Sequence, residues 1–335
     1  MVPQILVIVG PTSSGKTALS IMLAKKLNGE VISADSRQVY RGLDIGSGKV
    51  TKKEMVGVKH HLLDVASLKK VYTASDYVRD ASKAIKDILS RGKLPIICGG
   101  TGFYVDALVG RMPLPNVPPN PKLRARLEKK SARELFALLQ KTDPGRARTI
   151  DRHNPVRLVR ALEIAAQQRD KKDQGDTFRG SCHLPGGCKI TWTGIIPSRE
   201  VLQRKIHDRL FARMKTGMLA EARRLHARGL SWKRMESLGL EYRYMARYLQ
   251  GLISKKTMLA ELELAINQYA KRQITYWKRN KDIRWFVSAR NALDAIKRPQ
   301  RIRRGPTVRP DGRFIKTERA LPDAEQTSIF LVQVP

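Results

Sequence analysis

Short apolar runs alternate with amphipathic stretches over the first hundred residues of the chain. Apolar runs rich in Val, Ile and Leu predict buried strands. They lie at Gln4–Val9, Val31–Ala34 and Leu94–Cys98, with a further candidate at His60–Val65. Between them, apolar residues at helical spacing predict helices at Lys16–Leu27 and Ser75–Arg91. Strands that alternate with helices predict an α/β fold with a parallel sheet covered by helices.

The pattern changes at Met112–Pro121, where five prolines in ten residues end the alternation. Lys122–Gln168 then predicts charged helices, and Arg169–Gly187 predicts a polar loop. The segment Lys189–Ile196 (KITWTGII) then predicts a strand that rejoins the sheet. We therefore expect a discontinuous core of residues 1–112 and 189–290, interrupted by a mostly helical insertion domain of residues 113–188.

The rest of the chain is predicted to be helical up to Asn280, with breaks near Gly229 and Gly251. Ile283–Ser288 is a candidate edge strand. Lys297–Arg319 carries nine basic and two acidic residues and five Gly or Pro residues, which predicts a loosely held tail. We expect residues 291–335 to form this basic, flexible tail, either binding RNA or simply solvated.

The charge of the chain adds a partner to this picture. Its 335 residues include 65 Lys and Arg against 30 Asp and Glu, a net charge of +35. Solubility does not need so much charge, whereas binding to nucleic-acid phosphates does. A general basic bias of the proteome, or the tail alone, is the alternative explanation.

Other classes of protein are disfavoured by the composition. The three cysteines, Cys98, Cys182 and Cys188, are too few for a disulfide framework and lack the partners of a zinc site. The first strand begins too early for a signal peptide, and no apolar run is long enough to span a membrane. We expect a cytoplasmic protein without a membrane partner.

The strongest motif follows the first strand. It matches the pattern G-x-x-x-x-G-K-[ST] of a phosphate-binding loop, in the required order of strand, turn and helix. Backbone N–H groups and the helix N-terminus would supply partial positive charge, Lys16 a full charge, and the Thr17 hydroxyl a ligand for Mg²⁺. The predicted phosphate-binding residues are Gly10, Pro11, Thr12, Ser13, Ser14, Gly15, Lys16 and Thr17.

Two further polar groups are expected at the same sheet edge, because they also follow buried strands. Asp35 could bind a hydroxyl, hold a metal through water or act as a general base, or it could only cap the next helix. Gln38 both donates and accepts hydrogen bonds, which suits the edge of a base. Thr101 follows two glycines that allow close approach of a ligand, and a simple glycine turn is its alternative.

One expected feature of an ATPase is missing from the sequence. Apart from Asp35 and a weak candidate at Asp64, no apolar strand ends in the Asp that normally holds Mg²⁺ in such enzymes. No arginine-bearing lid of a nucleotide kinase is evident either. The loop is therefore a candidate to bind a diphosphate that is not part of ATP.

Taken together, the motifs resemble a known family. The segments GPTSSGKT, ISADSRQVYRGLDIGSGK, GGTGFYVDAL, RHNPVRLVRALEI, AEARRL and YAKRQITYWKRN occur in order between about Ile5 and Arg284. They resemble the tRNA dimethylallyltransferases (tRNA isopentenyltransferases), and the absence of the eukaryotic zinc finger favours the bacterial type. The resemblance implies a P-loop NTPase-like fold and an enzyme that binds dimethylallyl diphosphate, tRNA and Mg²⁺. We expect it to be a monomer.

The activity implied by the resemblance is a prenyl transfer to RNA. A dimethylallyl group passes from dimethylallyl diphosphate to the exocyclic N6 amine of the adenine 3′-adjacent to the anticodon, giving N6-isopentenyladenosine and diphosphate. The adenine is flipped out of the anticodon loop before it reacts, as chemistry on a stacked base generally requires.

The resemblance also implies that the insertion domain of residues 113–188 contacts tRNA, and it assigns roles to residues. It implies that Asp35 is the general base, that Thr101 lies beside the reacting centre, and that Lys16 and Arg209 bind the departing diphosphate. Leu238–Arg243 is longer than the corresponding stretch of many members. The implied tRNA contacts are Asp35, Ser36, Arg37, Gln38, Thr101, Arg157, Arg160, Arg243, Arg272 and Gln273.

Three other functions are compatible with parts of the pattern. A small-molecule P-loop kinase would use the same loop for ATP, but the charge of +35 and the missing Asp argue against it. An adenylate isopentenyltransferase would modify free nucleotides, and the basic charge and long insertion favour tRNA. A non-catalytic RNA-binding protein with a relic loop is disfavoured because Lys16, Thr17, Asp35 and Thr101 are all intact.

Overall fold

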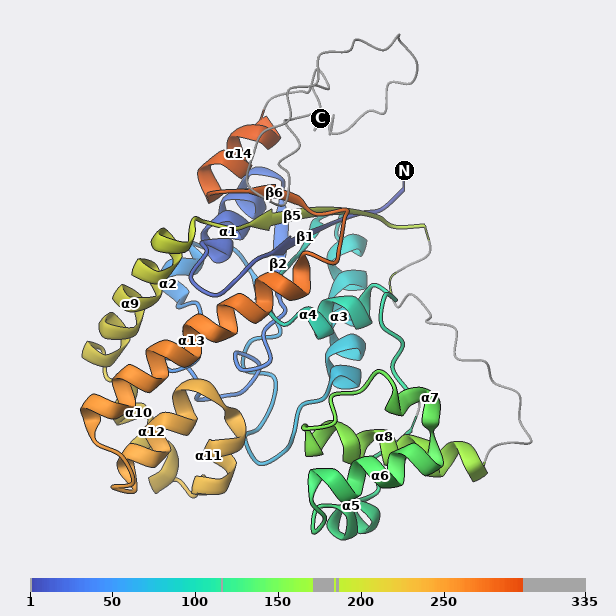
Figure 1. Cartoon of the computed structure of the whole chain (residues 1–335). Helices are drawn as coiled ribbons and strands as arrows, with labels where there is room; N and C mark the ends of the chain where they lie inside the picture. Colours follow the sequence, from blue (N-terminus) through green and yellow to red (C-terminus); the bar gives the residue numbers. More distant parts are fainter. Residues whose placement is uncertain (1, 116, 171–183, 185–186, 298–335) are drawn as a thin grey trace, which may run out of the picture. The chain divides into compact units, whose positions relative to one another are not determined.

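The computed structural model describes residues 2–115, 117–170, 184 and 187–297 (Figure 1). The chain divides into two compact units. The first unit comprises Met1–Tyr72, Lys83–Gly102 and Gly186–Pro335, and the second comprises Thr73–Ser82 and Phe103–Pro185. Most of the predicted polar loop, and the predicted tail from residue 298 on, lie outside the described residues.

The first unit contains a parallel sheet, which confirms the predicted fold class. In the described part of the chain it has six strands in the order β3-β2-β4-β1-β5-β6. β1 lies at the centre and its residues from Ile5 to Val9 are buried, as its continuous apolar run requires. The strands are β1 (Gln4–Val9), β2 (Gly29–Ser33), β3 (His60–His61), β4 (Leu94–Cys98), β5 (Lys189–Ile195) and β6 (Arg284–Phe286).

The predicted strand at His60–Val65 is wrong beyond its first two residues. β3 ends at His61 because Leu62 has φ +63° and Asp64 has φ +57°. Extended backbone requires a negative φ, so a strand cannot continue through these positions. By contrast, the edge strand expected near the end of the described chain is confirmed as β6.

Two helices that are far apart in sequence pack together beside the sheet. α1 (Lys16–Lys26) contacts α14 (Ala289–Lys297), and Ala292 is fully buried in the cluster that joins them (Figure 1). The prediction that a flexible tail begins at residue 291 is therefore wrong for residues 291–297, because they are helical. Two other helices are α2 (Lys52–Met55) and α3 (Ala74–Ser90), of which α3 belongs to the second unit up to Ser82.

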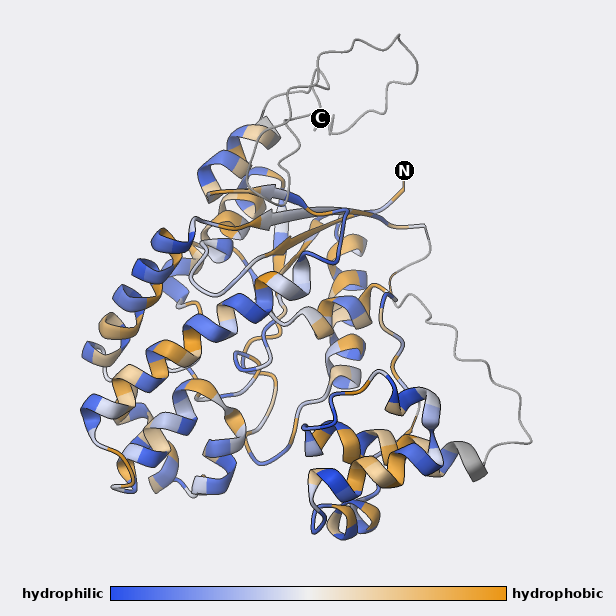
Figure 2. Ribbon diagram, in the orientation of Figure 1, coloured by the Kyte–Doolittle hydropathy of each residue, from blue (hydrophilic) through white to orange (hydrophobic). Residues whose placement is uncertain are grey.

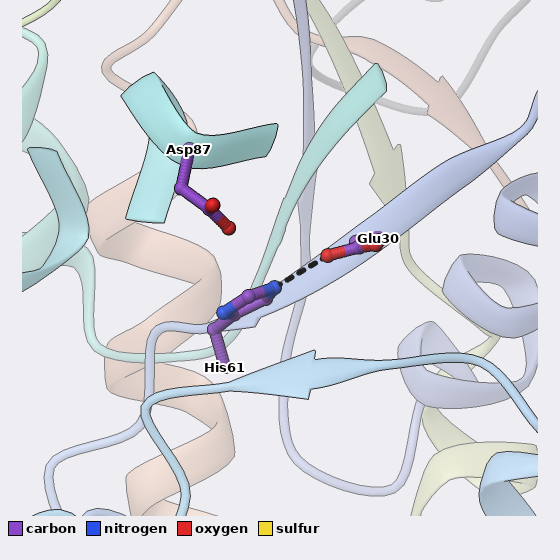
Figure 3. A group of neighbouring side chains, drawn as sticks. All are labelled: Glu30, His61 and Asp87. Atoms are coloured by element: carbon purple, nitrogen blue, oxygen red, sulfur yellow. Dashed lines mark hydrogen bonds and ion pairs between the residues drawn. The ribbon is translucent and has the colours of Figure 1, made fainter. Parts of the chain in front are cut away.

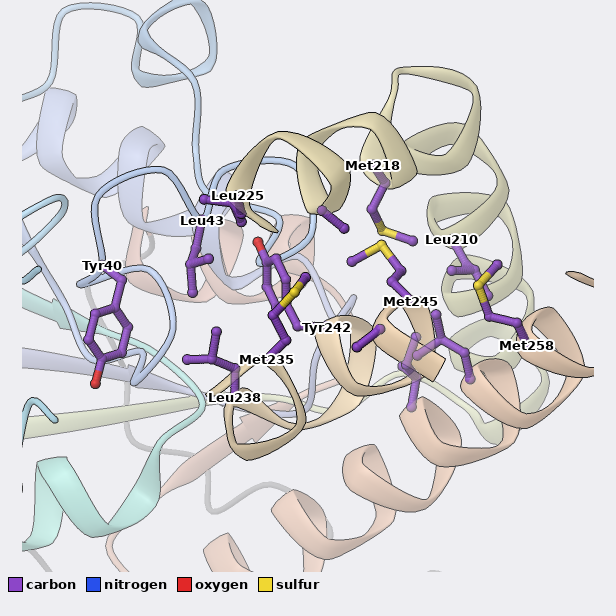
Figure 4. Packing of buried hydrophobic residues seen from close by; sticks show 14 of the residues in the cluster. Tyr40, Leu43, Leu210, Met218, Leu225, Met235, Leu238, Tyr242, Met245 and Met258 are labelled. Atoms are coloured by element: carbon purple, nitrogen blue, oxygen red, sulfur yellow. The ribbon is translucent and has the colours of Figure 1, made fainter. Parts of the chain in front are cut away.

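A layer of helices completes the first unit, built on a methionine-rich core (Figure 4). Both hydrophobic and hydrophilic residues occur along these helices (Figure 2). The helices are α9 (Arg199–Lys215), α10 (Met218–Ala227), α11 (Trp232–Leu238), α12 (Leu240–Leu249) and α13 (Lys255–Trp277). The C-terminal end of α13 brings Trp277 to 6.3 Å from Trp192 of β5, measured between ring centroids.

The helix breaks follow glycines with positive φ. The predicted breaks at Gly229 and Gly251 are confirmed, with φ of +91° and +74°. The chain also breaks at Gly217 and Gly239, which the sequence did not single out. These conformations favour glycine because it lacks a Cβ atom.

The second unit is helical in its described part and has a core of its own. Its helices are α4 (Gly102–Leu108, whose first residue belongs to the first unit), α5 (Pro121–Leu127), α6 (Ala132–Thr142), α7 (Pro144–Ala147) and α8 (Pro155–Asp170). Glu163 is 1% exposed, and Arg124 donates two hydrogen bonds of 2.7 Å to it. The amide of Asn120 donates a third, of 2.9 Å. These donors compensate the cost of burying a carboxylate.

Candidate active site

The loop between β1 and α1 has a conformation that depends on two glycines. Gly10 has φ +147°, and a Cβ atom there would lie 2.3 Å from the carbonyl oxygen of Ile195. Gly15 has φ +97° and stands at the N-cap of α1, where it offers no side chain to the first amides of the helix. Free N–H groups and the positive end of the helix dipole favour an anion at this point.

Lys16 and Ser14 give the loop its side-chain chemistry. Burial lowers the pKa of Lys16 to about 8; the charges of Cys98 and Asp35 oppose this shift, and that of Arg209 adds to it. An anion bound beside Lys16 would reverse the shift. Ser14 Oγ is buried and has no hydrogen-bond partner among the described residues. An unpaired buried hydroxyl fits a ligand oxygen that would complete its hydrogen bonding.

Gln273 of α13 ties the loop to the end of β4. Its Oε1 accepts a 2.8 Å hydrogen bond from the Thr12 amide, and its Nε2 donates a 3.0 Å bond to the Gly100 carbonyl. The side chain is 6% exposed. Both halves of the amide therefore form hydrogen bonds with the protein, so Gln273 holds the phosphate-binding loop and the end of β4 together.

Asp35 and Thr101 lie at neighbouring strand ends, as expected. Asp35 Oδ1 accepts hydrogen bonds from the amides of Arg37 (2.8 Å) and Gln38 (3.3 Å), which fixes the turn after β2. Its Oδ2 has no hydrogen-bond partner in the described part of the chain. Thr101 Oγ1 accepts a 3.0 Å bond from the amide of Ser36. The capping role and an open carboxylate oxygen coexist in Asp35.

A second loop, residues 44–48, contributes to the site through the carbonyl of Gly48. The Gly48 carbonyl accepts a 2.9 Å hydrogen bond from Arg209 Nη2 and a 3.3 Å bond from Gln38 Nε2. Burial lowers the pKa of Arg209 from its ordinary value, and the charge of Arg213 lowers it further. Arginine still remains charged at any physiological pH, so Arg209 brings a largely desolvated cation to the site.

Most of these groups line one cavity of about 560 Å³, a size typical of ligand pockets, but Thr101 does not. Residues that the sequence did not assign also line it, among them Lys205 and Tyr269. Burial raises the pKa of the Tyr269 hydroxyl. The predicted residues that line the cavity are Thr12, Ser13, Ser14, Gly15, Lys16, Thr17, Asp35, Gln38, Arg209 and Gln273.

The remaining predicted tRNA contacts lie elsewhere. In the first unit, Arg243 and Arg272 are exposed, and the guanidinium of Arg272 lies 5.9 Å from the ring centre of Tyr269. In the second unit, Arg157 is exposed on α8. Arg160 donates a 2.8 Å hydrogen bond to the carbonyl of residue 117, so part of its guanidinium serves the second unit itself.

A cluster that resembles a metal site proves to be an ion-pair network. Glu30, His61 and Asp87 place ligand atoms within 4.8 Å of one another (Figure 3). However, Arg91 and Lys93 donate hydrogen bonds to Glu30, and Arg91 also binds Asp87 at 2.7 Å. The hydrogen bond from Arg91 lowers the pKa of Glu30. Two fixed cations disfavour a metal ion here.

None of the described helices is both long enough and apolar enough to cross a membrane.

Residues 38–280 match the model of the IPP transferase family. The chain is similar to "tRNA dimethylallyltransferase 2" of Treponema denticola, with 43% identity over 82% of this chain and 91% of that one. It is also similar to "tRNA dimethylallyltransferase 2" of Trichlorobacter lovleyi, with 41% identity over 82% of this chain and 88% of that one.

Solved structures give the same picture. The tRNA isopentenylpyrophosphate transferase of Bacillus halodurans is 35% identical, with a TM-score of 0.62, over 84% of this chain and 89% of that one. The corresponding transferase of Staphylococcus epidermidis is 34% identical, with a TM-score of 0.63, over 88% and 97%. A eukaryotic dimethylallyltransferase acting on tRNA shares the fold, with a TM-score of 0.71 at 24% identity over 87% and 76%.

Proposed function

Because the chain belongs to the IPP transferase family, we propose that it transfers a dimethylallyl group from dimethylallyl diphosphate to N6 of the adenine 3′-adjacent to the anticodon of tRNA. One observation carries this proposal. A single cavity holds a phosphate-binding loop with Lys16, the desolvated cation of Arg209, and Asp35 with an open oxygen. These are the groups that such a transfer needs.

The cavity residues carry out different parts of the reaction. The bond between the allylic carbon and the diphosphate oxygen breaks, and the diphosphate leaves with the electron pair. Lys16, Arg209 and the amides of the loop bind the charge that develops on it, which is where electrostatic stabilisation acts most strongly. The adenine N6 forms the new bond to carbon, and Asp35 accepts its proton.

The loop also suits Mg²⁺ with a diphosphate. Thr17 is exposed to the cavity and Ser14 Oγ is unpaired, so a ligand oxygen and a cation would satisfy groups that the protein leaves open. Bound Mg²⁺ would neutralise part of the diphosphate charge. We assign Thr17 as its protein ligand and Ser14 to the diphosphate.

The acceptor is inferred from charge and from Gln38. A net charge of +35 suits an RNA polyanion better than a free nucleotide. Gln38 is at the cavity, where its amide can reach a base edge after exchanging its weak bonds of 3.3 and 3.4 Å. We further assign the second unit to tRNA binding, in keeping with the exposed Arg157 on α8.

The test is a competition between acceptors. Purified protein is given dimethylallyl diphosphate, Mg²⁺ and equal amounts of AMP and of tRNA with adenine 3′-adjacent to the anticodon. The tRNA is separated from the free nucleotides before it is digested to nucleosides, and both fractions are analysed by mass spectrometry. We expect prenylated adenosine from tRNA only. Prenylated AMP alone would establish an adenylate isopentenyltransferase, and ATP-dependent phosphorylation of a small acceptor without prenyl transfer would establish a kinase.

A further inference from the structure

Glu221 of α10 is a buried carboxylate that the proposed reaction does not use. It is 4% exposed. Its Oε2 accepts hydrogen bonds from the amides of Asp44 (3.1 Å) and Ile45 (2.7 Å). Its Oε1 accepts from the amide of Gly46 (2.9 Å) and from the hydroxyl of Tyr242 (2.8 Å). Four donors therefore converge on one side chain.

This arrangement is an anion-binding turn whose anion belongs to the protein. Three successive N–H groups that point to one place form a site for an anion. No Lys, Arg or His of the described residues forms an ion pair with Glu221, so backbone dipoles and one hydroxyl compensate its burial. Burial and the charge of Glu221 raise the pKa of Tyr242, which keeps its hydroxyl a donor.

The C-terminal end of the same loop lines the cavity at Ser47 and Gly48. Gly46 accepts a 2.8 Å hydrogen bond from Arg213, and Gly48 accepts those of Arg209 and Gln38. The amides of residues 44–46 are thus fixed by Glu221, while the carbonyls of residues 46 and 48 orient side chains. Arg209 and Gln38 both line the cavity.

The loop has little room to move. A Cβ atom on Gly46 would lie 2.7 Å from the Tyr242 ring, and one on Gly48 would lie 2.2 Å from Arg209 Nη2. Both glycines are in close contact with the groups that hold the loop or are held by it. A displacement of residues 44–46 would therefore be passed on to Arg209.

We propose that Glu221 is a positioning residue, whose carboxylate holds residues 44–48 so that the Gly48 carbonyl orients Arg209 toward the diphosphate. The inference rests on the proposed function insofar as that function gives Arg209 a diphosphate to bind. It extends that function by giving the buried motif residue Glu221 a task in substrate binding.

The first experiment compares Glu221→Gln with Glu30→Gln. Both substitutions neutralise a buried carboxylate of the first unit, but Glu30 holds Arg91 and Lys93 instead of the loop. Isothermal titration with inorganic diphosphate and Mg²⁺ gives the dissociation constant of each folded variant. We expect Glu221→Gln to raise it roughly tenfold, as loss of a supporting partner typically does, and Glu30→Gln to leave it unchanged. Equal constants in Glu221→Gln and wild type would overturn the proposal.

The second experiment asks whether Glu221 acts through Arg209. In a double-mutant cycle, Arg209→Ala should remove most of the effect of Glu221→Gln on diphosphate affinity, because its target is gone. Fully additive effects would contradict the proposed route. A merely destabilising substitution would lower the melting temperature without showing this coupling.

Two further measurements test the role of Glu221 independently of the folding of Glu221→Gln and of the proposed function. If Glu221→Gln does not fold, Glu221→Asp retains the charge but is one methylene too short to meet all four donors. Glu221→Asp should weaken diphosphate binding by less than the tenfold expected of Glu221→Gln. An affinity equal to that of the wild type would contradict the proposal. Failure of wild-type protein to prenylate tRNA would sink the proposed function, whereas the titrations would still decide the role of Glu221.

Discussion

The carboxylate of Asp35 performs two tasks with its two oxygens. Oδ1 accepts hydrogen bonds from the amides of Arg37 and Gln38 and so shapes the turn. Oδ2 has no hydrogen-bond partner among the described residues, so it can accept a proton from a substrate. Truncation to alanine would disturb both. Asparagine retains one carbonyl oxygen for the turn and removes the basicity, so it separates the two tasks.

Asp35→Asn should therefore lose prenyl transfer and keep the site intact. We expect single-turnover transfer to fall by about 10²- to 10⁴-fold, the usual contribution of a general base. Affinity for diphosphate should stay within a small factor of wild type, because Lys16 and Arg209 are unchanged. Transfer at the wild-type rate would show that Asp35 is not the base.

The lowered pKa of Lys16 predicts that the affinity for diphosphate depends on pH. Its pKa of about 8 in the free protein means that the side chain loses its proton above that pH, and bound diphosphate restores it. Binding should therefore take up a proton above pH 8, and affinity should fall as pH rises. Titration calorimetry in buffers of different ionisation enthalpy measures this uptake.

The matched control is Lys16→Arg, which stays charged throughout the range. Any pH dependence that remains in Lys16→Arg comes from the titration of diphosphate itself and can be subtracted. The same decline and the same proton uptake in both proteins would mean that Lys16 does not titrate in the site.

At this scale the sequence identified residues with local signatures and missed contacts between residues far apart in the chain. Gln273 was named only as a tRNA contact, and its hydrogen bond with Thr12 was not foreseen. Lys16 and Thr17 follow from the spacing of one motif. Gln273 braces Thr12, 261 positions away, and Glu221 holds Ile45, 176 positions away. No local pattern specifies such contacts, although Glu221 lies in a segment that the family resemblance singled out.

Among the elements, α14 departs most from the sequence prediction. Its apolar stripe consists of Ala289, Ala292 and Leu293, which pack against the cluster around α1. Two small alanines and one leucine give a weak hydrophobic signal beside a strongly basic segment. The strands were easier to predict because whole runs such as Ile5–Val9 are apolar.

Ala292→Glu tests whether α14 is part of the folded core. Ala292 is fully buried, so a carboxylate there would have no compensating partner among the cluster residues. We expect a loss of about 3 kcal/mol or more in the free energy of unfolding, measured with denaturant. Arg290→Glu, on an exposed position of the same helix, should cost much less. Equal, small losses would place α14 outside the core.

The helix breaks show why element boundaries were partly missed. Gly229 and Gly251 interrupt the apolar periodicity and were recognised. Gly217 and Gly239 lie between segments whose apolar spacing continues, so their left-handed conformations become visible only in the structure. The strand predicted beyond His61 failed for the same reason, at Leu62.

For the whole molecule, charge decides how the protein meets its partner. Of the net +35, residues 298–335 contribute eight Lys and Arg against four Asp and Glu, so a chain ending at residue 297 would retain +31. Most of the positive charge therefore belongs to the part that the structure describes and to the segment 171–186. The composition alone predicted a nucleic-acid partner, but it could not say which surface binds it.

Binding of tRNA should depend steeply on salt, with or without the last residues. We expect the affinity of both the full chain and residues 1–297 to fall by roughly 10³-fold or more between about 50 and 200 mM salt. Filter binding or fluorescence anisotropy measures both slopes. A shallow slope in the shortened chain alone would assign the phosphate contacts to residues 298–335.

The central claim is that the phosphate-binding loop holds a leaving diphosphate and transfers no phosphoryl group. The most direct measurement follows both products of dimethylallyl diphosphate labelled in its terminal phosphate, with tRNA and Mg²⁺ and without ATP. We predict that labelled diphosphate and prenylated adenosine appear in equal amounts. Label transferred to an acceptor, or any requirement for ATP, would contradict this account.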